Sequence, residues 1–114
     1  KATRMQVKAK QVGFEWKETS EVWNKVEEEI GELKEAVVSS DVSKIEDEFG
    51  DVLFSLVNYA RFVGVDPESA LEITNLKFKT RFMYMEAQAT AQGKNLGDMT
   101  LAEMDVLWNE AKTK

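Results

Sequence analysis

The stretch that decides the fold is VEEEIGELKEAVVSSDVSKIEDEFGD, which runs from Val26 to Asp51. It contains ten acidic residues, yet apolar side chains still recur at helical spacing on both sides of a central Ser-Ser-Asp break. A run of this kind is usually a solvated helix surface, and the alternative is a site that holds a divalent cation. The positions of the carboxylates relative to the apolar stripe of each helix distinguish the two interpretations.

The rest of the chain also has the sequence features of helices. One proline and six glycines occur among 114 residues, and alternation of β-branched with polar residues is nearly absent. We therefore predict an all-α fold, a helical bundle of about five helices. The expected helices cover residues 2–12, 21–39, 43–63, 67–92 and 101–112. The expected caps and stops are Thr19-Ser20, Ser43 with Glu46, Asp66-Pro67, Thr100 with Glu103, and the glycines Gly13, Gly64 and Gly93.

Composition limits the class of protein. A hydrophobic content of 43% with 32% charged residues is ordinary for a globular protein, and 114 residues suffice for one domain with its own core. No apolar run approaches the roughly 18 residues of a membrane span, no secretory signal is present, and the absence of cysteine excludes a disulfide framework. These features fit a cytoplasmic location, and the net charge of −6 argues against a general nucleic-acid binder. Because the chain begins at Lys1, we expect residues 1–114 to be a domain excised from a longer chain.

Helical geometry places the acidic residues of the two central helices on matching sides. At about 100° per residue, the apolar stripe of the first of these helices consists of Val22, Val26, Ile30, Leu33 and Val37. Glu29 and Glu32 lie beside this stripe, and Glu48 and Asp51 flank the stripe of the next helix on the same rotational side. A connection of about four residues makes the helices antiparallel, and both pairs then lie roughly 10 Å from the turn. We therefore expect the four carboxylates to meet.

Four carboxylates beside an apolar seam need a counter-charge, because repulsion and desolvation would otherwise raise their pKa values. Oxygen ligation without His or Cys selects hard cations, so the predicted cofactor is Mg²⁺, with Mn²⁺ as a substitute. The predicted metal ligands and catalytic residues are Glu29, Glu32, Glu48 and Asp51, with Glu28 as a further candidate ligand.

Several segments together resemble one known family. The EExxE of Glu28–Glu32 is followed after 15 residues by the ExxD of Glu48–Asp51. The segments that extend the pattern over nearly the whole chain are GFEW (Gly13–Trp16), VWNKVEEEIGEL, KIEDEFGDVLF, NLKFKTRF and EMDVLWNEAK. In these motifs the chain resembles the MazG family of nucleoside triphosphate pyrophosphohydrolases. It looks most like the catalytic C-terminal domain of two-domain or fused MazG proteins.

The resemblance implies an all-α bundle assembled as a homodimer, with Mg²⁺ held by the paired carboxylates. It also implies hydrolysis of nucleoside triphosphates between the α- and β-phosphates, which gives a nucleoside monophosphate and pyrophosphate. The positions that match substrate-binding residues are Lys25, Lys44, Lys77, Arg81, Trp108 and Lys112, with Asn75 as a further candidate. Lys77 and Arg81 are spaced i, i+4, so they share one helix face, and such cations suit a triphosphate.

Some alternatives stay open at the level of sequence. Trp108 fits stacking on a base or packing in the core, while Trp16 and Trp23 are expected to pack near the hydrophobic seam. The absence of His and Cys excludes a covalent intermediate on either residue, which leaves metal-assisted hydrolysis with Glu29 or Glu32 as the general base. The rival functions are a non-catalytic helical dimerisation module that binds divalent ions, and a narrower dUTP or dCTP pyrophosphatase. Apolar faces that a monomer leaves uncovered favour a homodimer or a dimer of dimers.

Overall fold

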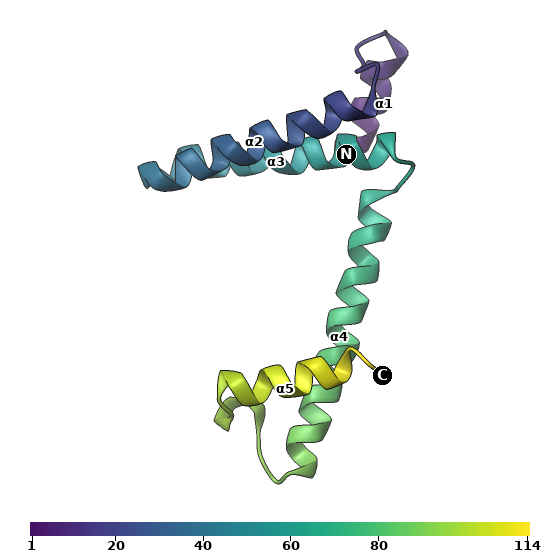
Figure 1. Ribbon diagram of the computed structural model, residues 1–114. Helices are drawn as coiled ribbons and strands as arrows, with labels where there is room; N and C mark the ends of the chain where they lie inside the picture. The colour runs from purple at the N-terminus through teal and green to yellow at the C-terminus, as the bar shows by residue number, and fades with distance from the viewer. The chain divides into compact units, whose positions relative to one another are not determined.

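The computed structural model describes residues Lys1–Lys114, which form helices and no strand. The helices are α1 (Ala2–Gln11), α2 (Thr19–Ser39), α3 (Val42–Phe62), α4 (Pro67–Ala91), the 3₁₀ turn η1 (Leu96–Asp98) and α5 (Leu101–Ala111), as Figure 1 shows. Two compact units divide the chain, Lys1–Pro67 and Glu68–Lys114. The prediction of an all-α fold with about five helices is confirmed. No helix combines the length and the apolar character that crossing a membrane requires.

The centre of the first unit is an antiparallel hairpin of α2 and α3, which lie side by side along their length (Figure 1). Val22 and Val26 of α2 are completely buried at 1% and 0% exposure, and Val52 of α3 is buried with them. Only part of each predicted apolar stripe is buried, since Val37 of α2 and Leu53 of α3 remain about half exposed. The hairpin therefore has a narrow apolar seam and leaves further apolar surface open.

The turn of this hairpin is shorter than expected, since only Ser40 and Asp41 separate the two helices. Ser40 adopts the left-handed conformation, with φ of 58°, and its N–H donates to the carbonyl of Val37. The Asp41 side chain caps α3 by accepting hydrogen bonds from the backbone N–H groups of Ser43 and Lys44. The expected capping box of Ser43 with Glu46 is therefore wrong, because Asp41 already occupies the cap position.

The remaining helix ends confirm some of the predicted caps and correct others. Thr19-Ser20 does not cap α2, since the helix already includes both residues and begins after Glu18 without a side-chain cap. Gly64 stops α3 as predicted, with φ of 76°. The N–H of Gly64 donates to the carbonyl of Arg61 at 3.3 Å, and that of Val65 donates to the carbonyl of Ala60 at 2.8 Å. This pair of bonds is a Schellman motif, and the positive φ explains the glycine.

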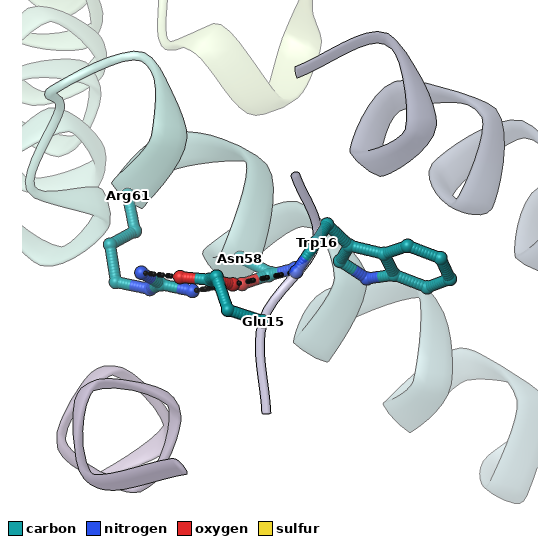
Figure 2. Close-up of polar contacts among 4 residues, drawn as sticks. All are labelled: Glu15, Trp16, Asn58 and Arg61. Carbon is teal, nitrogen blue, oxygen red and sulfur yellow. Dashed lines mark hydrogen bonds and ion pairs between the residues drawn. The ribbon is translucent and has the colours of Figure 1, made fainter. Parts of the chain in front are cut away.

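Two polar contacts fasten the N-terminal segment to α3. The Gln6 side-chain amide donates to the carbonyl of Phe54 at 2.9 Å. Arg61 donates to both carboxylate oxygens of Glu15, at 2.6 and 2.9 Å, and to the side-chain oxygen of Asn58 at 2.7 Å (Figure 2). The hydrogen bond from Arg61 lowers the pKa of Glu15 below its ordinary value, and Glu15 keeps only 18% of its side chain exposed. A bidentate, largely buried ion pair therefore fixes the loop between α1 and α2.

The second unit is built where α5 packs on the C-terminal part of α4. Its buried cluster consists of Met85, Ala89, Met99 and Leu107. The predicted capping box of α5 is present, because Thr100 accepts from the N–H of Glu103 at 3.1 Å and Glu103 accepts from that of Thr100 at 3.0 Å. In contrast, residues 71–80 of α4 are all exposed. The buried core of this unit therefore involves only the second half of α4.

The ion pair between Glu15 and Arg61 gives a pH-dependent prediction. Glu15→Gln should lower the free energy of unfolding by about 1–2 kcal/mol at pH 7, because the neutral amide leaves the half-buried guanidinium without its counter-charge. Because the pKa of Glu15 is lowered in the folded state, this contribution is complete above pH 4.5, the ordinary pKa of a glutamate. It disappears as the pH falls through the folded-state pKa. Urea denaturation of both proteins at pH 7 and at pH 3 measures the difference. The exposed change Glu27→Gln is the control, and a constant difference at both pH values would contradict the prediction.

Candidate metal centre

The hairpin brings carboxylates from both helices to one place. Glu29 of α2 and Glu48 and Asp51 of α3 each offer an oxygen, and these three oxygens lie within 4.8 Å of one another. Glu29 comes seven residues after Val22 and three after Val26, so the carboxylate cluster lies next to the buried seam on α2. The meeting of these residues follows from the antiparallel pairing, because carboxylates at similar distances from the turn become neighbours.

Two oxygens of this cluster are buried without any hydrogen-bond donor. Glu29 is only 6% exposed, and its Oε2 atom has no partner. The Oε2 atom of Glu48 is also buried and unpartnered. A buried carboxylate oxygen without a donor is costly, and a cation between the two helices is one partner that would satisfy both oxygens. Carboxylate oxygens are hard ligands, so this donor set fits Mg²⁺ or Mn²⁺.

Part of the negative charge is balanced by Lys25, one turn before Glu29. The Lys25 ammonium lies 2.9 Å from Oε1 of Glu29 and 3.4 Å from Oε1 of Glu28. Its hydrogen bond to Glu29 is the main reason that the pKa of Lys25 is raised. Glu28 therefore joins the site through Lys25, with 57% of its side chain exposed, while its role as a ligand stays a prediction.

Glu32 adjoins the same cluster from the solvent side. It is exposed, and the negative charge of Glu29 is the main cause that raises the pKa of Glu32, with desolvation and Glu48 adding to it. Like charges raise a carboxyl pKa only when they lie close together. All four acidic residues expected from the sequence therefore gather near the middle of the α2–α3 hairpin, and their roles as ligands stay predictions.

Comparison with known proteins identifies the family. The family model described as the MazG nucleotide pyrophosphohydrolase domain matches residues 17–84, which include all four acidic positions. The chain belongs to this family.

Curated relatives resemble the MazG domain over most of its length. A Thermotoga maritima protein named nucleoside triphosphate pyrophosphohydrolase/pyrophosphatase MazG is 47% identical over 111 residues, which is 97% of this chain and 42% of that protein. An Escherichia coli K12 protein named nucleoside triphosphate pyrophosphohydrolase is 38% identical over 98% of this chain and 43% of its own length. The Bacillus subtilis protein YabN, named as uncharacterized, is 58% identical over 57% of this chain and 13% of its own length. The chain thus spans less than half the length of these relatives.

The candidates for substrate binding in the MazG domain lie in both units. Lys25 of α2 and Lys44, which is exposed in the first turn of α3, belong to the first unit. The remaining candidates belong to the second unit and are Asn75, Lys77, Arg81, Trp108 and Lys112. The Arg81 guanidinium lies over the Trp108 ring, 5.4 Å from its centre, and Trp108 also contacts Phe78 and the buried cluster. Trp108 therefore packs within its unit, and its role at the nucleotide stays a prediction. Lys77, Asn75 and Lys112 are exposed.

The sequence analysis missed three polar residues of the first unit, Gln6, Glu15 and Arg61. Together with Asn58 and several apolar side chains they line one cavity. Trp16, expected to pack near the seam, lines it as well with 46% exposure. Trp23 is similarly half-exposed and contacts Tyr59 at 4.9 Å between ring centres. The sequence does indicate that Asn58 and Arg61 lie together. They follow Asp51 by seven and ten residues, which places them on the same side of α3.

The unpartnered oxygens give a prediction for metal binding. Mg²⁺ or Mn²⁺ at a hundred times its Kd should stabilise the fold by about 2.7 kcal/mol, because the ion binds the native cluster and not the unfolded chain. Glu48→Gln should remove most of this stabilisation, while the metal-free variant should be at least as stable as the wild type, since repulsion is relieved. Thermal unfolding with and without Mn²⁺ measures both effects. Glu35→Gln is the control on an exposed position of α2, and a full metal shift in Glu48→Gln would show that the ion binds elsewhere.

Proposed function

We propose that this MazG domain hydrolyses nucleoside triphosphates between the α- and β-phosphates and releases pyrophosphate. The observation that supports this most directly is the carboxylate cluster on α2 and α3, in which Glu29 and Glu48 each have a buried oxygen without a partner. A site that needs a hard cation and opens to solvent through Glu32 suits a substrate that arrives as a metal-bound polyphosphate. The names of the Thermotoga maritima and Escherichia coli relatives support the same reaction class.

The carboxylates have distinct parts in this reaction. Glu29, Glu32, Glu48 and Asp51 would hold the divalent cation, Mg²⁺ or Mn²⁺. When bound, the cation neutralises phosphate charge and makes a water molecule easier to deprotonate. Glu29 or Glu32 then accepts the proton of the attacking water, whose oxygen bonds to phosphorus as the bridging P–O bond breaks. Pyrophosphate leaves, and the nucleoside monophosphate remains.

The basic residues complete the charge balance of the substrate. Lys25 binds Oε1 of Glu29 and leaves Oε2 for a cation, so its ammonium group would lie beside the cation and could donate a further hydrogen bond to a phosphate oxygen. Lys44, Lys77, Lys112 and Arg81 supply further positive charge, with Asn75 as a hydrogen-bonding side chain. Arg81 is the best suited of these, because its planar guanidinium binds two phosphate oxygens at once and Trp108 holds it in place.

A homodimer is the assembly that we propose for this domain. Phe49, Leu53 and Leu56 of α3 are between 41% and 53% exposed, although they lie on the apolar stripe of that helix. Exposed apolar residues that follow one helix face usually mark an interface. A second copy that covers this face would bring the carboxylates of two hairpins into one assembly. The rival function, a non-catalytic dimerisation module, would form the same kind of assembly.

Pyrophosphate release tests the proposed function and separates it from its rivals. The domain with Mg²⁺ should release pyrophosphate from nucleoside triphosphates, and Asp51→Ala or Glu32→Ala should reduce the rate at least a hundredfold while helicity stays unchanged. A panel of ribo- and deoxynucleotides distinguishes broad activity from a dUTP or dCTP pyrophosphatase. Glu35→Ala is the matched surface control. Wild-type protein without activity toward the whole panel would leave the dimerisation module as the function.

Arg81 should contribute to binding of the substrate and not to binding of the metal. Arg81→Ala should lower kcat/KM by about one to two orders of magnitude, because a charge-assisted hydrogen bond contributes about 1.5–3 kcal/mol. Arg81→Lys should recover part of the loss, and Mn²⁺ binding without nucleotide should be unchanged. Lys79→Ala is the control, since it removes a charge from another face of α4. Wild-type kcat/KM in Arg81→Ala would remove Arg81 from the substrate site.

The assembly is checked by light scattering at micromolar concentration. The wild type should have the mass of a dimer or of a dimer of dimers, and Leu53→Glu should dissociate it, because a charge would be buried in the apolar interface. Val38→Glu is the control, since Val38 is 85% exposed at the hairpin tip. A stable wild-type monomer would exclude this assembly.

A further inference from the structure

The hairpin of α2 and α3 is closed by different contacts at its two ends. At one end, Ser40 and Asp41 form the turn that connects the helices. At the other end, Arg61 in the last turn of α3 binds Glu15 in the loop that leads into α2 (Figure 2). Only residues 16–18 separate Glu15 from Thr19, the first residue of α2. The ion pair therefore ties the start of one helix to the end of the other.

This ion pair has one defined geometry. Both terminal nitrogens of Arg61 donate to Glu15, at 2.6 and 2.9 Å, and one of them also donates to Asn58, three residues earlier in α3. The Glu15 carboxylate accepts a further hydrogen bond from the backbone N–H of Trp16, at 3.2 Å. The side chains of Arg61 and Glu15 are only 14% and 18% exposed, so water competes little for the pair. A bidentate pair of this kind fixes the loop in position.

The apolar contacts at the same end fix the helices less closely. Val22 of α2 is buried, and the ring centre of Trp23 lies 4.9 Å from that of Tyr59 of α3. Hydrophobic burial is non-directional, so a small shift of α2 along α3 would change little of the buried area. The ion pair is therefore the most specific contact between the start of α2 and the end of α3.

The carboxylate cluster lies between these two ends. Glu29 is ten residues from either end of α2, and Glu48 and Asp51 come six and nine residues after the first residue of α3. Their oxygens lie within 4.8 Å of one another, so without a cation the like charges push the helices apart. Arg61 is ten residues beyond Asp51, which is roughly 15 Å along the helix axis. It is thus too far away to contact the cluster or an ion bound there.

We propose that Arg61 is a positioning residue of the metal centre: by binding Glu15, it holds α2 against α3 and keeps the carboxylates in binding geometry before a cation arrives. The proposal rests on the proposed function, since it requires the carboxylates to bind a metal ion. Mg²⁺ demands nearly ideal octahedral geometry, so a small displacement of Glu29 relative to Glu48 lowers the affinity. A hairpin that is closed in only a fraction of the molecules binds the ion with an affinity reduced by that fraction.

Metal binding by variants of the ion pair tests this role. Glu15→Gln and Arg61→Gln should bind Mn²⁺ about 3-fold to 10-fold more weakly than the wild type, because the helices separate in part of the molecules. Arg61→Lys should recover part of the affinity, since it keeps the charge but lacks the fork geometry. Electron paramagnetic resonance of free Mn²⁺ measures the affinity of the full chain without nucleotide. Each titration is made under conditions in which circular dichroism shows the variant to be fully folded.

A distance measurement reports the closure of the hairpin directly. The chain has no cysteine, so nitroxide labels can be placed by Ser20→Cys at the start of α2 and Val63→Cys after the end of α3. The otherwise unchanged chain should give one narrow distance distribution by pulsed electron paramagnetic resonance. Adding Glu15→Gln should produce a second, longer distance in the metal-free protein. Mg²⁺ should reduce this second population, because metal binding and closure favour each other reciprocally.

The matched control is Thr100→Ala, which removes the cap of α5 in the other unit and so lowers stability without changing the hairpin. It should leave the Mn²⁺ affinity unchanged. Equal affinities of Glu15→Gln and the wild type would overturn the proposal, as would an equal loss in Thr100→Ala or an unchanged distance in Glu15→Gln. The ion pair would then contribute to stability alone. A wild type that binds no Mn²⁺ would instead contradict the proposed metal centre, and with it the role of Arg61.

Discussion

The antiparallel packing of α2 against α3 is the constraint on which the rest of the structure depends. Val22, Val26 and Val52 form its buried seam, and this seam sets the rotation of both helices. Because Glu29 and Glu48 flank the seam, packing the apolar residues forces acidic side chains toward each other. Hydrophobic burial thus supplies the free energy that holds mutually repelling carboxylates together, an arrangement typical of sites that hold cations.

The sequence was sufficient for those features that depend on local pattern. Helical periodicity and glycine stops predicted five helices, and the spacing of Glu29, Glu32, Glu48 and Asp51 predicted that they meet. These features follow from the period of the helix and the length of the turn, which a sequence displays directly. Cap positions were less accurate at the start of α3, because Asp41 and Ser43 can both serve as caps and only the backbone path selects Asp41.

Contacts between distant segments could not be predicted from the sequence. Nothing in the local pattern indicated that Glu15 would pair with Arg61, since these residues are 46 positions apart and each is ordinary for a surface. The same applies to Gln6, whose amide reaches the backbone of Phe54. Trp16 was misjudged for a related reason, because a large aromatic residue near an apolar stripe fits a core and a cavity wall equally well. The cavity exists only through the tertiary placement of α1 and its loop.

The ion pair of Lys25 with Glu29 gives the carboxylate cluster a counter-charge that the chain itself carries. The ammonium group lies 2.9 Å from Oε1 of Glu29, while Oε2 of the same carboxylate has no partner. A cation bound at Oε2 would therefore share Glu29 with Lys25 and would leave the ammonium group in place. The cluster would then keep one fixed positive charge with or without the metal, and this charge would offset part of the repulsion among the carboxylates in both states.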